Sequence, residues 1–418
     1  MKSELVQKAY EIAKERYAAM GVDTEKVLEQ MQDFHLSLHC WQADDVKGFE
    51  VQAGELTGGI QATGNYPGAA RNIDELRADI VKAKSYIPGT HRLNLHEIYG
   101  DFKGKVVDRD EVTPEYFESW IEWAKENNMK LDFNSTSFSH PKSGNLSLAN
   151  PDEGIRNFWI EHTKRCREIS EAMGKAQGDP CIMNLWVHDG SKDQTVNKYL
   201  YRSLLKDSLD KIFATKYDNM KDCIESKVFG IGLESFTVGS NDFYTAYAAQ
   251  NNKLITLDTG HFHPTESVAD KVSAMLLYVP ELMLHVSRPI RWDSDRVTIM
   301  DDPTLDLFQE IVRAGALDRV HYGLDYFDAS INRIGAYVIG SRAAQKCMLR
   351  ALLEPLATLR KYEAEGKGFE RLALLEEEKA MPWQAVYDEF CLRNNVPVGE
   401  EFIADVEKYE AEVTSKRA

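Results

Sequence analysis

The sequence predicts an α/β fold, a (β/α)8 barrel with a helical extension at each end. Short apolar segments alternate with amphipathic helical patterns eight times between residues 33 and 329, as expected for a closed parallel barrel. Several segments end in carboxylate or imidazole side chains, which is typical of the catalytic rim of a TIM barrel. The chain has 418 residues, more than a minimal barrel requires. We therefore expect an N-terminal helical segment at 1–32, the barrel at 33–329 and a C-terminal helical extension at 330–418.

The expected elements follow in chain order. Helical periodicity covers residues 3–31, and the glycine-rich stretch 56–67 lacks the spacing of a nucleotide loop, so it should be a loop over the rim. Strands are expected at residues 34–41, 92–97, 129–134, 181–186, 221–227, 253–258, 282–286 and 320–325. Helices are expected at residues 72–85, 113–127, 155–174, 198–214, 243–249, 266–277 and 304–314.

The chain beyond the eighth strand is helical throughout. Residues 331–365 form a long helical pattern, and the remainder to the C-terminus shows charged helical faces with no further strand pattern. The 331–365 segment carries more apolar surface than a free helix would keep. We expect it to pack on the barrel wall or on a neighbouring subunit.

Composition narrows the class of function. The formal net charge of -17 argues against a nucleic-acid surface, which needs clustered Lys and Arg. No apolar run reaches membrane-spanning length, and the charged amphipathic N-terminus differs from a signal peptide, so we expect a cytoplasmic protein with no membrane partner. The six cysteines are scattered without a C-x-x-C pair, which predicts neither a disulfide framework nor a zinc knuckle. A small neutral molecule is the expected substrate.

The last four expected strands supply a cluster of metal-ligand residue types. Asp258 and His261 lie one turn apart, so both can reach one cation, and Asp293 and Asp295 point the same way if their segment is extended. An acidic residue after a strand is often only a helix cap, and a single histidine is often a core residue; the repetition over four strands favours a metal site. The candidate ligands are Glu225, Asp258, His261, His285, Asp293, Asp295 and Asp325.

Charge balance favours two cations over one. The candidate ligands include five carboxylates (-5), which two divalent ions (+4) and Lys227 (+1) bring to zero. Carboxylate-rich ligation with two imidazoles and no thiolate favours Mn²⁺, Mg²⁺ or Co²⁺ before a structural Zn²⁺.

These residues resemble the two-metal site of the xylose-isomerase-like barrels, and the sequence as a whole is similar to the L-rhamnose isomerase family nearly end to end. The matching motifs are His39-Cys-Trp-Gln, Gly59-Ile-Gln-Ala-Thr-Gly-Asn-Tyr-Pro, Leu93-Asn-Leu-His96, Gly260-His-Phe-His-Pro and Phe327-Asp-Ala-Ser-Ile-Asn-Arg333. The resemblance implies that Glu225, Asp258, His285 and Asp325 hold one ion. It also implies that Asp258 bridges to a second ion held by His261, Asp293 and Asp295.

The resemblance further implies the reaction. It is the interconversion of L-rhamnose and L-rhamnulose, the first step of rhamnose catabolism, by a metal-promoted 1,2-hydride shift that depends on manganese. The resemblance also implies a homotetramer, with a dimer as the alternative. Related aldoses are alternative substrates. A metal-dependent barrel hydrolase would need a basic groove for phosphate, and a metal-stabilised scaffold would close its coordination spheres.

Roles for individual side chains follow from position and from the resemblance. Lys227, two residues after a candidate ligand, is expected to face the cavity and donate to the sugar O1, with charge balance alone as the alternative. For His96 the resemblance implies contact near the sugar ring oxygen and help in ring opening, against a purely structural histidine. Asp325 is expected to be catalytic as well as a ligand. Trp186 and Trp41 could wall the pocket against the C6 methyl, although a tryptophan at the rim is often plain packing.

Three further histidines lie near the expected strand ends. His263 follows His261 by two residues, and we expect a supporting or structural role because Pro264 turns the chain at once. His39 and His188 are left without a role.

Overall fold

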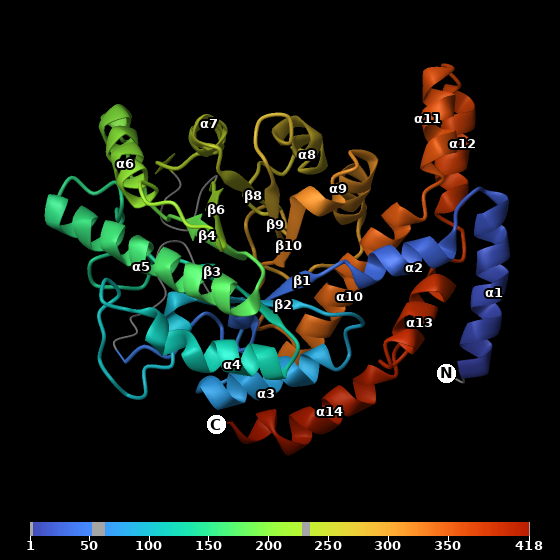
Figure 1. Cartoon of the computed structure of the whole chain (residues 1–418), viewed down its shortest axis with the longest axis horizontal. Coiled ribbons are helices and arrows are strands. Elements are labelled where there is room, and N and C mark those ends of the chain that lie inside the picture. The colour runs from blue at the N-terminus through green and yellow to red at the C-terminus, as the bar shows by residue number, and fades with distance from the viewer. Residues whose placement is uncertain (1–2, 52–62, 228–234, 418) are drawn as a thin grey trace.

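Eight parallel strands form the centre of the molecule (Figure 1). A computed structural model describes residues 3–51, 63–227 and 235–417, so residues 56–62 of the expected rim loop lie outside the described part. The strands close into a barrel in the spatial order β1, β2, β3, β4, β6, β8, β9 and β10, which confirms the predicted fold class. They are β1 (Leu36–His39), β2 (Arg92–His96), β3 (Lys130–Asn134), β4 (Cys181–Trp186), β6 (Met220–Glu225), β8 (Leu254–Asp258), β9 (Leu282–Val286) and β10 (Val320–Leu324).

Helices connect the strands and surround the barrel (Figure 1). Several begin where the sequence places an N-cap side chain: Asn72, Asp152 and Asp301 each accept a hydrogen bond from a backbone N–H of the first helical turn. The helices are α3 (Ile73–Lys84), α4 (Glu118–Glu126), α5 (Glu153–Gln177), α6 (Lys198–Ile212), α7 (Asn241–Asn251), α8 (Ala269–Met275) and α9 (Asp302–Arg313). Short 3-10 turns are η1 (Cys40–Gln42), η2 (Glu97–Tyr99), η3 (Pro114–Phe117), η4 (Leu317–Arg319) and η5 (Thr414–Lys416).

Two of the expected long helices are broken. The N-terminal segment divides into α1 (Ser3–Ala19) and α2 (Thr24–Gln32), because Gly21 adopts φ +80° and Asp23 caps the second helix. The 331–365 segment divides into α10 (Arg333–Leu352) and α11 (Leu356–Ala364), with Pro355 at the N-cap of the latter. Helical periodicity continues across both breaks, and for that reason it predicted single helices.

The C-terminal chain folds back along the barrel. The helix α10 contacts β1, α3 and α9, and its Arg333 forms a buried ion pair with Asp45, 2.7 Å between Nη2 and Oδ2. At the end of the chain, Arg417 pairs with the buried Asp79 of α3. The helices α11 and α12 project beside the N-terminal helix (Figure 1). The remaining elements are α12 (Gly368–Glu378), α13 (Trp383–Arg393) and α14 (Phe402–Glu412).

A small antiparallel pair, β5 (Gly190–Ser191) and β7 (Phe236–Thr237), was not predicted. Each strand is two residues long, too short for side-chain alternation to be visible in the sequence. It joins the loops that follow β4 and β6. Together these loops extend the same end of the barrel at which β4 and β6 finish.

The two ends of the barrel carry different side chains. The amino-terminal end holds a small group of ion pairs and an apolar cluster, whereas polar side chains gather at the carboxyl-terminal end. At the amino-terminal end, Glu281 lies between Lys221 and His321, with 2.6 Å from its Oε2 to His321 Nε2. Burial raises the pKa of Glu281, but hydrogen bonds from these two side chains outweigh burial and lower it to about 2. Ile182, Cys223, Leu254 and Met283 form a separate apolar cluster. Polar side chains line the other end, where parallel barrels bind their ligands.

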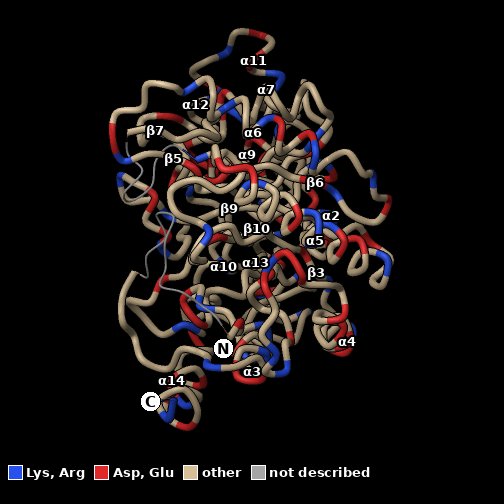
Figure 2. The backbone as a smooth tube through the Cα atoms, turned by 90° about the vertical axis from the view of Figure 1, so that its left-hand side faces the viewer, with Lys and Arg blue, Asp and Glu red and all other residues tan. Residues whose placement is uncertain are grey.

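Charged side chains of both signs are interspersed along the backbone (Figure 2). In the described part of the chain, helices are all either too short or too polar to cross a lipid bilayer.

Candidate metal centre

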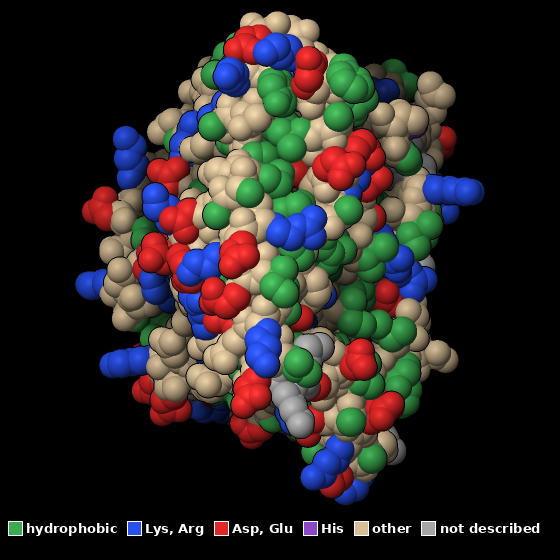
Figure 3. Space-filling view, turned by 90° about the vertical axis from the view of Figure 1, so that its right-hand side faces the viewer, with side chains coloured by type: hydrophobic (Ala, Val, Ile, Leu, Met, Phe, Trp, Pro, Cys, Tyr) green, Lys and Arg blue, Asp and Glu red, His purple; other side chains and the backbone are tan. Residues whose placement is uncertain are grey.

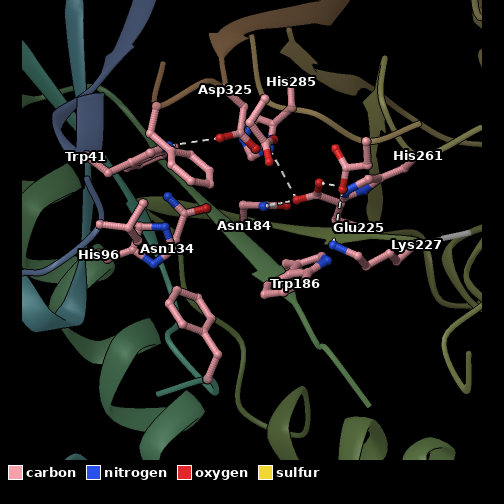
Figure 4. Close-up of a pocket in the computed structure, with 15 residues that line it drawn as sticks. Trp41, His96, Asn134, Asn184, Trp186, Glu225, Lys227, His261, His285 and Asp325 are labelled. Carbon is pink, nitrogen blue, oxygen red and sulfur yellow. Dashed lines mark hydrogen bonds and ion pairs between the residues drawn. The ribbon is translucent and has the colours of Figure 1, made fainter. Parts of the chain in front are cut away.

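The predicted ligands come from the ends of four consecutive barrel strands (Figure 4). Glu225 and Asp258 are the last residues of β6 and β8, His285 lies near the end of β9, and Asp325 directly follows β10. One ligand atom from each of these four side chains lies within 4.8 Å of the corresponding atom in the others. Strand pairing explains the convergence, because Asp258 is the direct neighbour of His285 on β9. The arrangement could hold one cation.

A second group shares Asp258 with the first. Ligand atoms of Asp258, His261 and Asp293 also lie within 4.8 Å of one another. The turn after β8 brings His261 back, since the amide of Gly260 donates to Asp258 Oδ1 at 2.6 Å. A Cβ atom at Gly260 would lie 2.5 Å from Asp293 Oδ1. The turn therefore needs glycine in order to let the two carboxylates approach each other.

Asp295 departs from the expected geometry. The segment is not extended as the prediction assumed, because Asp295 adopts a left-handed φ of +44°. Both side chains still line the same cavity, but Asp295 belongs to neither of the two ligand groups found among the described residues. Its role as a ligand stays a prediction.

A hydrogen bond orients the ring of His261, whereas the ring nitrogens of His285 make no hydrogen bond of good geometry in the described part of the chain. His261 Nδ1 lies 2.7 Å from the carbonyl oxygen of Ser226 and donates to it, which turns Nε2 toward Asp293, 3.1 Å from its Oδ2. His285 is buried, and neither of its ring nitrogens has a hydrogen-bond partner in the described part of the chain, although Nδ1 is 3.2 Å from both Glu225 Oε2 and Asp325 Oδ2. A buried imidazole that makes no well-directed hydrogen bond and lies beside two candidate carboxylate ligands fits a metal ligand.

The electrostatics also favour bound cations. Burial raises the pKa of Asp258 well above its usual value, and Glu225 and Asp325 raise it further against the opposite effect of His261. The pKa of Asp295 is raised by burial and then by Asp293 and Asp325. Carboxylates that retain protons in this way lack sufficient positive charge around them. Divalent cations supply that charge, and the donor set of carboxylates and imidazoles suits them.

Two residues support the ligands from behind. The indole Nε1 of Trp41 donates to Asp325 Oδ1 at 2.9 Å, shown as a dashed line in Figure 4. The amide of Asn184 donates to Glu225 Oε2, and Asn184 in turn accepts from Thr256 at 2.7 Å. Such contacts orient metal ligands. The only sequence signal for Asn184 was a polar residue in an otherwise apolar strand, and Trp41 had been considered only as a pocket wall.

Apolar side chains line the same cavity as most of the ligands. Its apolar residues are Trp41, Val46, Phe138, Trp186 and Phe327. Val46, Phe138 and Phe327 had not been predicted to line the site. Val46 has φ +59°, a rare conformation for a β-branched residue, and the loop is held by the ion pair from the neighbouring Asp45 to Arg333. The surrounding structure therefore holds Val46 in an unfavourable backbone conformation in which its side chain lines the cavity.

The predicted substrate-contacting residues also line this cavity. Lys227 is buried, its Nζ lies 3.2 Å from Asp293 Oδ2 and 4.6 Å from the centre of the Trp186 ring, and Figure 4 shows it beside Trp186. Burial lowers the pKa of Lys227, but Asp293 and Asp295 outweigh burial and raise it, so the ammonium stays charged. His96 lies across the pocket, 4.7 Å between its ring centre and that of Trp41, and burial lowers its pKa to about 4. It is a neutral imidazole at physiological pH.

The three further histidines considered from the sequence belong to neither ligand group. His263 is exposed and bonds to Thr265. His188 contacts Ser137, and His39 is buried against Trp41 and Tyr326.

Comparison with known proteins decides the family. The sequence profile described as "L-rhamnose isomerase (RhaA)" matches residues 4–417. The chain belongs to the L-rhamnose isomerase family. A relative from Bacteroides thetaiotaomicron named L-rhamnose isomerase is 84% identical over 416 residues, covering 100% of both chains. One of the same name from Mannheimia succiniciproducens is 55% identical over 414 residues, covering 99% of both.

The similarity of this chain to solved structures is weaker than its similarity to these sequence relatives. A D-psicose 3-epimerase from Clostridium cellulolyticum is 13% identical, with a TM-score of 0.43, covering 78% of this chain and 99% of that chain. The strand pairing described above establishes the barrel independently of this likeness.

Proposed function

We propose that this protein interconverts L-rhamnose and L-rhamnulose as an aldose–ketose isomerase. The observation that carries the proposal is the pair of ligand groups that share Asp258, because most of their residues line one cavity together with apolar side chains. Family membership supports the choice of sugar, since relatives at 84% and 55% identity bear the name L-rhamnose isomerase. The site thus combines a place for two cations with space for a small polar molecule.

The proposed cofactor is a pair of divalent cations, with Mn²⁺ first and Mg²⁺, Co²⁺ or Zn²⁺ as alternatives. Glu225, Asp258, His285 and Asp325 would hold one ion. Asp258, His261 and Asp293 would hold the other, with Asp295 as a further candidate. When bound, the two cations would polarise O1 and O2 of the open-chain sugar and stabilise the negative charge that develops as hydrogen moves between C1 and C2. The order of preference among metals follows from the carboxylate-rich donor set.

Lys227 is proposed to donate a hydrogen bond to O1 of the sugar. Its ammonium is held between Asp293 and the face of Trp186, so its position is set before substrate binds. A preorganised charge of this kind stabilises a developing oxyanion at little reorganisation cost. Lys227→Met should reduce kcat more than it raises KM. Normal kcat in this variant would leave Lys227 with charge balance alone.

His96 and the apolar wall are proposed to bind the rest of the sugar. His96 lies on the side of the cavity opposite Lys227 (Figure 4), where it can reach the ring oxygen of a bound pyranose. Trp186 joins Val46, Phe138 and Phe327 in the wall, which suits a methyl group rather than a hydroxymethyl group at C6. Asp325 is proposed to act both as a ligand and in proton transfer.

The test uses metal-free protein reconstituted with Mn²⁺ and offered a panel of aldoses. We expect L-rhamnose to give L-rhamnulose with the highest kcat/KM, and activity to be lost on chelation. L-Rhamnose labelled with deuterium at C2 should keep the label at C1 of the ketose if hydrogen moves by a hydride shift. Complete washout would favour an enediol route, and ketose from none of the aldoses would contradict the isomerase proposal.

We also propose a homotetramer in the cytoplasm. Support for association comes from exposed apolar side chains: Leu5 and Ile12 of α1 and Phe369 and Leu372 of α12 are all more than half exposed. Figure 3 shows apolar side chains among charged ones on the face that includes these helices. Sedimentation analysis would measure the oligomeric state, and cell fractionation would test the location. The division into segments 1–32, 33–329 and 330–418 likewise stays a proposal, testable by expressing 33–418 alone.

A further inference from the structure

The loop after β3 carries a threonine that contacts His96 from behind. Thr136 Oγ1 lies 3.1 Å from His96 Nδ1. Both residues are buried, and Thr136 is completely inaccessible to solvent. His96 lines the sugar cavity, so its other ring nitrogen, Nε2, is the one available to a bound molecule. The contact with Thr136 therefore bears on how His96 meets the substrate.

Two further side chains hold Thr136 in place. Its backbone N–H donates to His162 Nε2 at 3.0 Å, so the proton of His162 is on Nδ1, which donates to the carbonyl of Arg109 at 3.1 Å. The guanidinium of Arg109 donates to the carbonyl oxygens of Thr136 and Phe138, both at 2.6 Å. Arg109 is itself buried and paired with Glu50. Thr136 is thus fixed on both sides of its peptide unit.

The direction of the hydrogen bond between Thr136 and His96 follows from satisfying the hydroxyl proton. His96 Nδ1 is the only partner of Thr136 Oγ1 among the residues that the structure describes. If Nδ1 carried the ring proton, the hydroxyl could only accept, and its own buried proton would be left without an acceptor. If the hydroxyl donates to the Nδ1 lone pair, both groups are satisfied. The ring proton of the neutral imidazole then lies on Nε2.

We propose that Thr136 is a positioning residue that fixes the tautomer of His96, so that Nε2–H faces the sugar as a hydrogen-bond donor. The inference deepens the proposed function, because it specifies what His96 does in binding the pyranose. In this tautomer Nε2 has no free lone pair, so His96 cannot accept a proton from a sugar hydroxyl. It donates a hydrogen bond to a substrate oxygen, for which the ring oxygen, an acceptor without a proton, is the matching partner.

The direct test is the tautomer of His96 in the resting protein. Solid-state ¹⁵N spectra of histidine-labelled Mg²⁺ protein, with the His96 signals assigned by their loss in His96→Asn, report which ring nitrogen is protonated. We expect Nε2–H in the unmodified chain. Nδ1–H would overturn the proposal without any variant of Thr136. Because this measurement requires no turnover, it remains interpretable even if L-rhamnose is not the substrate.

Substitutions of Thr136 provide the second test. Thr136→Ser keeps the hydroxyl and should retain kcat/KM on L-rhamnose within about threefold, whereas Thr136→Val keeps the shape and should lose about tenfold, mainly through KM. Thr163→Val is the matched control, because the Thr163 hydroxyl bonds within α5 to Trp159. Mn²⁺ affinity should be unchanged in all three. Equal kcat/KM for the serine and valine variants would overturn the proposal.

Discussion

The hydrogen bond from Trp41 to Asp325 gives the sharpest test of the metal centre. Trp41→Phe removes the indole N–H that lies 2.9 Å from Asp325 Oδ1. It keeps an aromatic ring beside His96 and His39, whose ring centres lie 4.7 and 5.4 Å from that of Trp41. The variant therefore isolates one contact to one ligand.

The expected magnitude follows from the type of bond. Removing a partner that orients a metal ligand weakens metal binding by about 10- to 100-fold, which corresponds to roughly 1.4–2.7 kcal/mol. A hydrogen bond to an ionised carboxylate contributes a similar amount, about 1.5–3 kcal/mol. We expect a loss in this range for the ion that Asp325 would hold, and little change for the ion held by His261 and Asp293.

Calorimetric titration of metal-free protein with Mn²⁺ measures both affinities. Trp186→Phe is the matched control: Trp186 lines the same cavity, but its Nε1 has no hydrogen-bond partner in the described part of the chain. We expect its Mn²⁺ affinity to be unchanged. The reasoning is refuted if Trp41→Phe binds both ions normally, or if Trp186→Phe weakens binding as much as Trp41→Phe does.

Three further predictions concern one ion pair of the barrel and two residues of the site. Hydrogen bonds from His321 and Lys221 lower the pKa of Glu281 from 4.5 to about 2, so ionised Glu281 stabilises the fold above about pH 4.5, and this stabilisation is lost as the pH falls toward 2. Glu281→Gln should therefore lower the free energy of unfolding in urea by about 2 kcal/mol at pH 7, and the difference from the unmodified protein should shrink below pH 4.5. A difference that stays constant with pH would contradict this prediction. Gly260→Ala places a Cβ 2.5 Å from Asp293 Oδ1, so Mn²⁺ titration should show weakening by at least about tenfold in a protein that still folds by circular dichroism; normal affinity would show that the turn can widen. Val46→Ala shortens a side chain that lines the cavity, so the cavity becomes larger beside the C6 group of the sugar. The ratio of kcat/KM for L-rhamnose to that for L-mannose should fall by about tenfold, and an unchanged ratio would show that Val46 does not select the sugar.

The strand segments were predictable because burial imposes a simple pattern on them. Each is a short segment with buried side chains between helical patterns, and β4, β8 and β9 lie within a residue of their predicted bounds. The breaks at Gly21 and Pro355 were also visible as residues that interrupt helices. They were missed because periodicity was given more weight than these residues.

The supporting contacts of the site could not be predicted in the same way. Trp41 and Asp325 are 284 residues apart in the chain, and Thr136 and His96 are separated by 40. No local pattern links such pairs, since their contact depends on which strands become neighbours when the barrel closes. The left-handed backbone of Val46 is likewise imposed by surrounding structure, because a β-branched residue disfavours it.

By itself, the sequence determined the barrel, the order of its elements and the residue types that gather at its carboxyl-terminal end. Those features depend on local hydrophobic periodicity and on the rule that parallel strands end at one rim. The family resemblance implied that Asp258 joins two ligand groups, but only the tertiary structure decided which ligand atoms lie within reach of one another. It also decided that Trp41 supports Asp325 and that Thr136 lies behind His96. These facts depend on distances across the barrel, which closure of the sheet sets and local sequence does not encode.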